Sequence, residues 1–190
     1  MTDPNRPPLT FAFFPEVATF EVTSDDIADG ATLANAQVAN FMGYSGENLS
    51  PQLSWSGFPA ETKSFAVTVH DPDAPTGSGF WHWLALNIPA DVNEFASGAS
   101  STGELPAGVL ELRNDAGTQG YVGAAPPSGD TPHRYVTTVH ALDVERLDVD
   151  ANSSAAIALR RSISSSRRAL ICVSISGLNQ RNRLRPSLFA

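Results

Sequence analysis

Short apolar runs separated by clusters of proline and glycine are the feature that most constrains this fold. The chain holds 14 Gly and 14 Pro in 190 residues. Both residue types mark turns, so the pattern favours many short strands over long helices. Hydrophobic residues make up 42% of the chain and charged residues 17%. A disordered chain has fewer apolar residues than this, so we expect one folded, mainly β domain.

Alternation of side chains and enrichment in β-branched residues predict six strands. They are Thr19–Thr23, Gln52–Trp55, Ser64–His70, Phe80–Asn87, Arg134–Leu142 and Ala169–Ser176. Within the third strand, Phe65, Val67 and Val69 would share one face. The spacing of the runs predicts a two-sheet antiparallel β-sandwich with Greek-key connections.

One or two short helices are also predicted, one of them near the C-terminus. Asn152 or Ser153 is expected to cap that helix, because both side chains accept hydrogen bonds from free backbone N–H groups. Its buried face would hold three residues spaced for one side of a helix, Ala156, Leu159 and Ile163. A second short helix is expected around residues 24–28.

The domain is expected to span residues 16–178. Residues 1–15 are rich in proline and polar residues, which predicts a loosely ordered segment. Residues 179–190 form a basic tail, and seven of the 12 Lys and Arg residues lie between Arg160 and Arg185. Such a run of charge is usually a solvated face, and a docking patch for an acidic partner is the alternative.

Charge and apolar content limit the partners that we expect. A formal net charge of −8 repels nucleic acid and anionic lipid, so no nucleic-acid partner is expected. No run approaches the roughly 18 apolar residues of a membrane span, so stable membrane insertion is not expected either. The single Cys172 lies in an apolar run and is interpreted as a small buried hydrophobe. The absence of a basic segment followed by an apolar one at the start predicts a cytoplasmic protein.

Three segments carry residues that could form a site. The first, residues 70–75, places Asp71 and Asp73 directly after a strand, where two prolines force the chain out of the sheet. The second, residues 77–84, carries His82 between two tryptophans. The third, residues 120–135, is a loop rich in Gly and Pro that ends at His133 and Tyr135. Each segment also has a purely structural alternative. The first could be a solvated turn, the second could carry a core histidine satisfied by a hydrogen bond, and the third could simply connect two strands.

The alternation of the second segment predicts where its histidine points. His82 would share a face with Leu84 and Leu86, while Trp81 and Trp83 would point the other way. If the three segments meet, their two imidazoles and backbone N–H groups would suit an oxygen of a phosphate or carboxylate. The carboxylates could accept hydrogen bonds from an ammonium or hydroxyl group of the same ligand.

In these segments the sequence resembles the phosphatidylethanolamine-binding protein family, and in particular its bacterial Raf-kinase-inhibitor-like branch. The stretches that carry the resemblance are Asn48–Pro51, Leu53–Trp55, Asp71–Pro75, Phe80–Trp83, Asn87–Pro89, Gly120–Gly123 and Pro126–Tyr135. The family implies a β-sandwich with a small anion pocket at one end. Carried over by position, the pocket would be lined by Asp71, Asp73, Pro75, His82, Ala125, Pro126, His133 and Tyr135.

The resemblance also implies what such a protein does. The ligand would be a phosphate-bearing lipid headgroup, a phosphorylated group or a small anion such as acetate. The role would be regulatory signalling toward a protein kinase or protease, with no turnover, metal or cofactor, and with a homodimer among the expected states.

Three alternatives use the same residues or the outer surface. A hydrolase would use Asp71 with His82 or His133 as an acid–base pair, with Ser78 as the nearby serine. A zinc site could be built from the same two histidines and Asp71. An inhibitor that blocks a kinase or protease by its surface would be compatible with the pocket.

Overall fold

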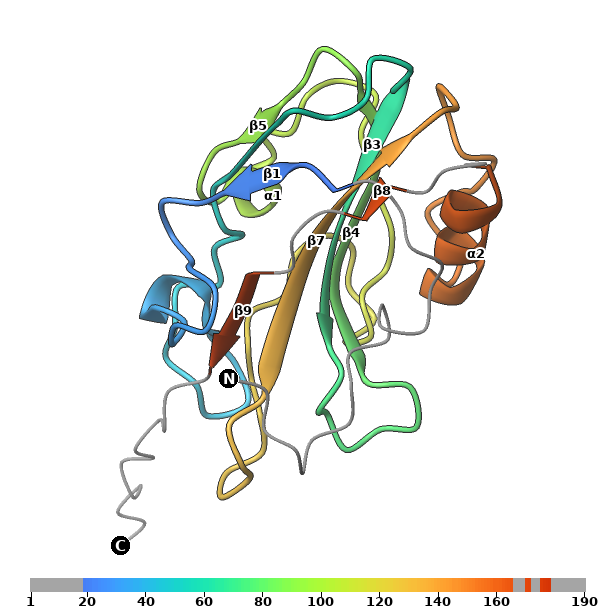
Figure 1. Cartoon of the computed structure of the whole chain (residues 1–190). Helices are drawn as coiled ribbons and strands as arrows, with labels where there is room; N and C mark the ends of the chain where they lie inside the picture. Colours follow the sequence, from blue (N-terminus) through green and yellow to red (C-terminus); the bar gives the residue numbers. More distant parts are fainter. Residues whose placement is uncertain (1–18, 166–169, 172–174, 179–190) are drawn as a thin grey trace, which may run out of the picture.

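Two antiparallel sheets form the molecule. The structure is a computed structural model that describes residues 19–165, 170–171 and 175–178. The smaller sheet has the order β1 (Glu21–Thr23), β2 (Leu53–Ser56) and β5 (Glu94–Phe95). The larger sheet holds β3 (Ser64–Asp71), β4 (Phe80–Pro89), β6 (Leu110–Glu111), β7 (Arg134–Leu142), β8 (Leu170–Ile171) and β9 (Ile175–Leu178). The prediction of a mainly β, two-sheet architecture is confirmed (Figure 1).

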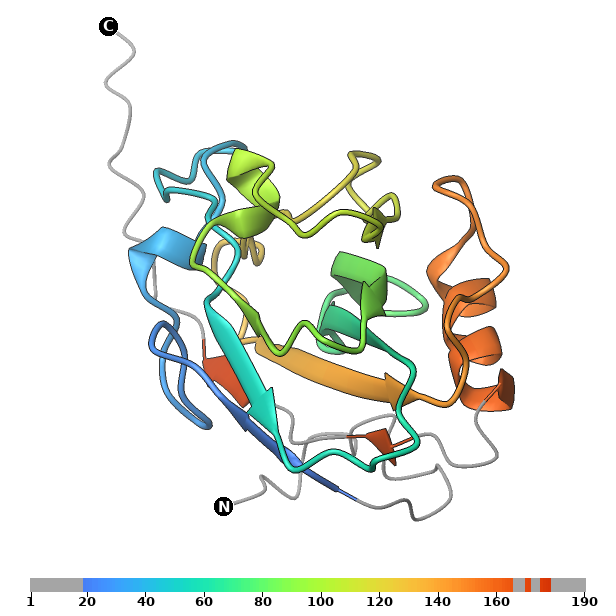
Figure 2. The ribbon, with the colours of Figure 1, turned by 90° about the horizontal axis from the view of Figure 1, so that it is seen from above.

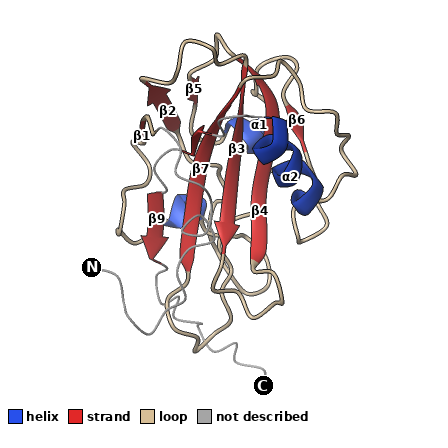
Figure 3. Ribbon diagram, turned by 45° about the vertical axis from the view of Figure 1, so that its right-hand side comes forward, coloured by secondary structure: helices blue, strands red, loops and turns tan. Residues whose placement is uncertain are grey.

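The order of strands in the larger sheet explains its long-range contacts. From one edge it is β6, β4, β3, β7 and β8, and β9 pairs with β7 on the same side as β8 (Figure 3). The order β7-β3-β4-β6 is that of a Greek key, as predicted. Because β3 lies between β4 and β7, the β3–β4 turn and the segment entering β7 meet at one end of the sheet.

Apolar side chains cover both faces of the larger sheet. Between the sheets, Phe65 and Val67 of β3 pack with Trp55 of β2 and Phe95 of β5. On the outer face, Ala66, Leu84 and Leu86 form a second cluster with residues of the last helix. Figure 2 shows that helix on one side of β7 and the strands β1 and β2 on the other. Apolar cover on both faces accounts for the continuous burial of β3, in which every residue is buried.

In the described part of the chain, three short helical segments accompany the sheets. They are η2 (Asn35–Gln37), α1 (Ala99–Thr102) and α2 (Ala155–Ser165). The predicted helix near the C-terminus is therefore confirmed as α2. The helix predicted around residues 24–28 is wrong, because the Ser24 hydroxyl accepts hydrogen bonds from the backbone of Asp26 and Ile27 and holds this segment as a turn.

The predicted cap and buried face of α2 need correction. The Ser154 hydroxyl, rather than Asn152 or Ser153, accepts the hydrogen bond from the Ile157 amide in the first turn. The residues buried against the sheet are Ala155, Ala158 and Ser162. The predicted face is wrong because its first member, Ala156, is exposed, whereas its third, Ile163, has a side chain outside the described set. Small side chains allow the helix to approach the sheet closely.

A β-bulge interrupts β4 at His82. Val69 of β3 pairs with Trp83, but the next residue, His70, pairs with Trp81. His82 is therefore an extra residue in β4, opposite no residue of β3. The bulge lets Trp81 turn to the outer face, where its ring stacks on His70 with a centroid distance of 4.0 Å.

This bulge changes the side of the sheet to which His82 points. Its ring lies 5.1 Å from the ring of Tyr135, which belongs to the core between the sheets. Leu84 and Leu86 belong to the outer cluster beneath α2. The prediction that His82 shares their face is wrong, because strict alternation assumed a regular strand.

Some predictions fall on residues that the structure does not describe. The segment 1–15, the tail 179–190 and Cys172 lie outside the described residues, and the expected domain limits of 16–178 stay a prediction. The predicted strand Ala169–Ser176 includes β8 and the start of β9, with residues 172–174 outside the description. None of the helices in the described part of the chain is long and apolar enough to cross a bilayer.

Candidate functional site

A buried carboxylate and imidazole pair lies at the end of β3. Asp71 is the last residue of β3, and His133 directly precedes β7. Asp71 Oδ2 lies 2.7 Å from His133 Nδ1, and both side chains are almost fully buried. Asp71 Oδ1 also accepts a hydrogen bond from the Asp73 amide at 2.9 Å. Burial raises the pKa of Asp71, and the contact with His133 opposes this effect.

Asp73 is held by Arg134 across the same two strands. The Arg134 guanidinium donates to both oxygens of Asp73, at 2.8 and 2.7 Å. The Arg134 backbone amide also donates to Asp73 Oδ2 at 2.8 Å. These bonds raise the pKa of Arg134 and fix the turn after β3 against the start of β7. Asp73 therefore positions the Asp71–His133 pair.

His82 is fixed by the backbone of the loop that precedes His133. Its Nδ1 lies 2.8 Å from the Val122 carbonyl oxygen, and the Val122 amide donates to the His82 carbonyl at 2.9 Å. A carbonyl oxygen only accepts, so Nδ1 carries the proton. Burial lowers the pKa of His82 to about 4, against smaller effects of the Val122 and Gly123 carbonyls. His82 is therefore neutral near pH 7, and its Nε2 is an acceptor.

Tyr135 brings a hydroxyl group to the same region. Its ring packs against His82, and its side chain is buried. The hydroxyl makes no hydrogen bond to any described residue. Burial raises the pKa of Tyr135, and the negative charge of Asp71 adds to the same shift.

The loop of residues 120–133 forms one wall of the site. Gly123 packs so closely on the η2 region that an added Cβ would lie 2.5 Å from the Ala39 nitrogen. Further along, Tyr44 donates a hydrogen bond from its hydroxyl to the Pro126 carbonyl. These contacts hold the loop that positions His82 through Val122.

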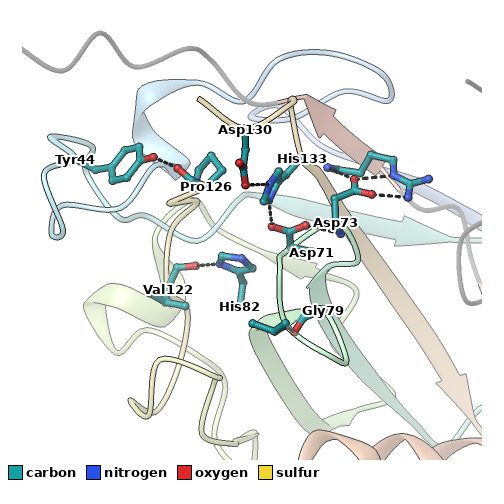
Figure 4. Close-up of polar contacts among 11 residues, drawn as sticks. Tyr44, Asp71, Asp73, Gly79, His82, Val122, Pro126, Asp130 and His133 are labelled. Carbon is teal, nitrogen blue, oxygen red and sulfur yellow. Dashed lines mark hydrogen bonds and ion pairs between the residues drawn. The ribbon is translucent and has the colours of Figure 1, made fainter. Parts of the chain in front are cut away.

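Figure 4 shows the side chains of His82, His133, Asp71 and Asp130 grouped at this end of the molecule. The structure thus brings Asp71, His82 and His133 together, and Tyr135 lies against His82. We refer to Asp71, His82, His133 and Tyr135 as the niche. The group contains two imidazoles, a carboxylate and a phenol, all buried.

The remaining predicted site residues lie around this niche. Asp73 is paired with Arg134, and Pro75 is exposed in the β3–β4 turn. Pro126 is buried in the wall, next to the half-buried Ala125. Whether these residues contact a ligand stays a prediction.

Sequence reasoning missed three groups of the site. They are the Val122 carbonyl, the Tyr44 hydroxyl and Asp130, whose Oδ2 lies 3.5 Å from His133 Nε2. Asp130 is three residues before His133, a spacing that could have drawn attention to it. The Val122 carbonyl had no signal in the sequence, because every residue carries one.

The residues of the alternative functions are arranged as follows. Ser78 is exposed, and its carbonyl oxygen lies 3.1 Å from Nε2 of His70 on the outer face. Across the described residues, no cluster of three or more His, Cys, Asp or Glu side chains is placed to hold a metal ion.

Comparisons with known proteins identify the family. The chain matches the family model of phosphatidylethanolamine-binding protein over residues 23–167. It is 54% identical over 138 residues to the UPF0098 protein YbhB of Escherichia coli K12, which covers 72% of this chain and 87% of YbhB.

Solved structures agree with this match. The crystal structure of E. coli YbcL, described as a member of the mammalian PEBP family, has a TM-score of 0.79 and 44% identity, and the match covers 86% of this chain and 99% of YbcL. The PEBP homologue CT736 from Chlamydia trachomatis has a TM-score of 0.70 and 26% identity over 85% of this chain and 97% of CT736. This chain belongs to the phosphatidylethanolamine-binding protein family.

Proposed function

We propose that this protein binds a small phosphate-bearing or carboxylate ligand, such as a phospholipid headgroup, in the niche. Family membership and the convergence of His82, His133 and Asp71 support this proposal. The Tyr135 hydroxyl can donate to an oxygen of an anion, and the carboxylates and the unprotonated His82 Nε2 can accept from an ammonium or hydroxyl group of the same ligand.

The observation that carries the proposal is the Tyr135 hydroxyl. It is buried and bonded to no described residue, beside an imidazole whose Nε2 is also available. A buried polar group without a partner costs about 1–3 kcal/mol, so such groups in native proteins need an explanation. A ligand oxygen that accepts from this hydroxyl would supply the missing bond.

Binding without turnover is the second part of the proposal. Among the described residues, no serine, threonine or cysteine side chain forms a hydrogen bond with His82 or His133. A hydroxyl or thiol nucleophile is normally activated by such a contact. We therefore favour a binding protein over the hydrolase alternative, and the absence of ester or phosphate release with a substrate panel would agree.

A regulatory role in the cytoplasm completes the proposal. A kinase or protease would be the protein partner, and occupancy of the niche would modulate that contact. The single cysteine cannot form an internal disulfide, which suits a reducing compartment. A pull-down with and without phosphoethanolamine, and cell fractionation, test these two points.

A pair of tyrosine variants tests the binding site. Tyr135→Phe removes the hydroxyl without a partner, so it should leave the stability of the free protein unchanged or raise it, and should weaken binding of O-phosphoethanolamine by about tenfold. Tyr121→Phe is the matched control, because its hydroxyl donates to the Gln37 carbonyl and should affect stability more than affinity. Calorimetry that finds no binding to the wild-type protein, or equal affinity for Tyr135→Phe, would refute the proposal.

A further inference from the structure

Asp130 places a second carboxylate against His133. Its Oδ2 lies 3.5 Å from His133 Nε2, while Asp71 Oδ2 lies 2.7 Å from Nδ1 of the same ring. The imidazole is therefore flanked by acids on both nitrogens (Figure 4). Any proton on Nε2 is directed toward Asp130 before a ligand arrives.

The cation of this region is already paired. Arg134 donates to both oxygens of Asp73, so its charge is balanced within the protein. An anionic ligand that reaches His133 from the side of Asp130 meets that carboxylate directly. Like charges at such distances repel, and part-burial strengthens the repulsion.

The groups next to Asp130 do not offset its repulsion of an anionic ligand. His82 donates through Nδ1 to Val122, so its Nε2 is an acceptor and offers no proton to an anion. Tyr44, which lies within electrostatic range of Asp130, donates its hydroxyl proton to the Pro126 carbonyl. The niche therefore holds at least two acceptors, Asp130 and His82 Nε2, that a bare oxyanion cannot satisfy.

We propose that Asp130 makes the niche selective for an oxyanion that carries its own proton, such as a hydrogen phosphate monoester, over a sulfate ester of the same shape and charge. The P–O–H group donates a hydrogen bond to the Asp130 carboxylate, and another oxygen of the phosphate accepts from the Tyr135 hydroxyl. A sulfate ester has no such proton near neutral pH, so its oxygens face the carboxylate unpaired. This inference rests on the proposed function and names the ligand class of the same site.

Two esters that differ in this proton provide the test. O-Phosphoethanolamine and ethanolamine O-sulfate have the same skeleton and the same ammonium group. At pH 5.5 the phosphate monoester is mostly singly charged, because its second pKa is about 6. Calorimetry on the full chain should then find the phosphate ester bound at least about tenfold more tightly, since only it can donate to Asp130.

Two variants assign this preference to Asp130. Its side chain is 42% exposed, so Asp130→Asn should fold normally. The amide can donate to sulfate, so the ratio of the two affinities should fall to within about twofold, mainly through tighter sulfate-ester binding. Asp91→Asn is the control, because it removes the same charge from an exposed site after the far end of β4 and should retain the preference.

The outcomes separate this inference from the proposed function. Equal affinity of the wild-type protein for both esters, or a preference that persists in Asp130→Asn, overturns the role of Asp130 and leaves anion binding in place. Binding of neither ester overturns both proposals together.

Discussion

Val122 holds His82 at two points, with its amide on the His82 carbonyl and its carbonyl on the imidazole Nδ1. The first bond ties the main chain of β4 to the loop of residues 120–133, which is not a strand of the sheet. The second bond places the imidazole proton on Nδ1. Because His82 is the extra residue of a bulge, this main-chain contact determines which way its ring faces.

We predict that His82 is neutral, with its proton on Nδ1, down to about pH 5. Burial lowers its pKa to about 4, so protonation at neutral pH is unfavourable. Two-dimensional ¹⁵N NMR of the imidazoles should show an unprotonated Nε2 for His82 and no change between pH 8 and 5. A titration near pH 6.5, or a proton on Nε2, would contradict the geometry.

Gly79 is predicted to be intolerant of any side chain. Its φ is +72°, and an added Cβ would lie 2.5 Å from both the Asp71 carbonyl oxygen and His70 Nε2. Gly79→Ala should lower the free energy of unfolding by about 2–3 kcal/mol, because strain and overlap add. Gly77→Ala, in the same turn with open space around it, should change it by less than about 0.5 kcal/mol. Urea denaturation of both variants measures the difference, and equal values would argue against this turn geometry.

The Asp73–Arg134 pair is predicted to stabilise the site more than a surface ion pair does. Its side chains are only 12% and 16% exposed, and three hydrogen bonds join them. Asp73→Asn should cost about 2 kcal/mol of unfolding free energy and weaken ligand binding indirectly through Asp71. Asp148→Asn breaks the exposed pair with Arg161 and should cost less than about 0.5 kcal/mol. Chemical denaturation that ranks the two variants in reverse order would show that this pair is not an anchor.

Stability is predicted to fall as the pH decreases from about 6.5 to 4. Burial lowers the pKa of both His82 and His140 to about 4, whereas an unfolded histidine has a pKa of about 6.5. Between these values the unfolded chain binds more protons, so the free energy of unfolding rises with pH and is lost on acidification.

A variant of His140, one of the two buried histidines outside the niche, isolates part of this effect. His140 lies on the outer face, where its Nε2 is 3.3 Å from the Thr68 hydroxyl. His140→Asn should reduce the slope of stability against pH between 6.5 and 4, whatever its cost at pH 7. Urea titrations at several pH values give the slope, and an unchanged slope would mean that His140 is not buried in its neutral form.

Much of the fold could be predicted from local patterns. The strand Arg134–Leu142 was predicted with its observed limits, and Ser64–His70 falls one residue short of β3. Both runs are long and rich in β-branched residues, and each has a proline close to one end, Pro72 after the first and Pro132 before the second, so local preferences and burial both favour a strand. Asp71, Asp73 and His133 could be identified as candidates because they are polar residues at the ends of these buried runs.

The sequence by itself therefore determined the positions of the long strands and the residue types that meet at one end of the sheet. The tertiary structure decided which way each side chain faces: His82 toward Tyr135, Asp73 toward Arg134, and Asp130 toward His133. Bulges and ion pairs depend on the register between strands that are far apart in the chain. Contacts of backbone carbonyls, such as that of Val122, cannot be predicted from residue type, because every residue has a carbonyl group. Orientation in this site is consequently a property of the assembled sheet.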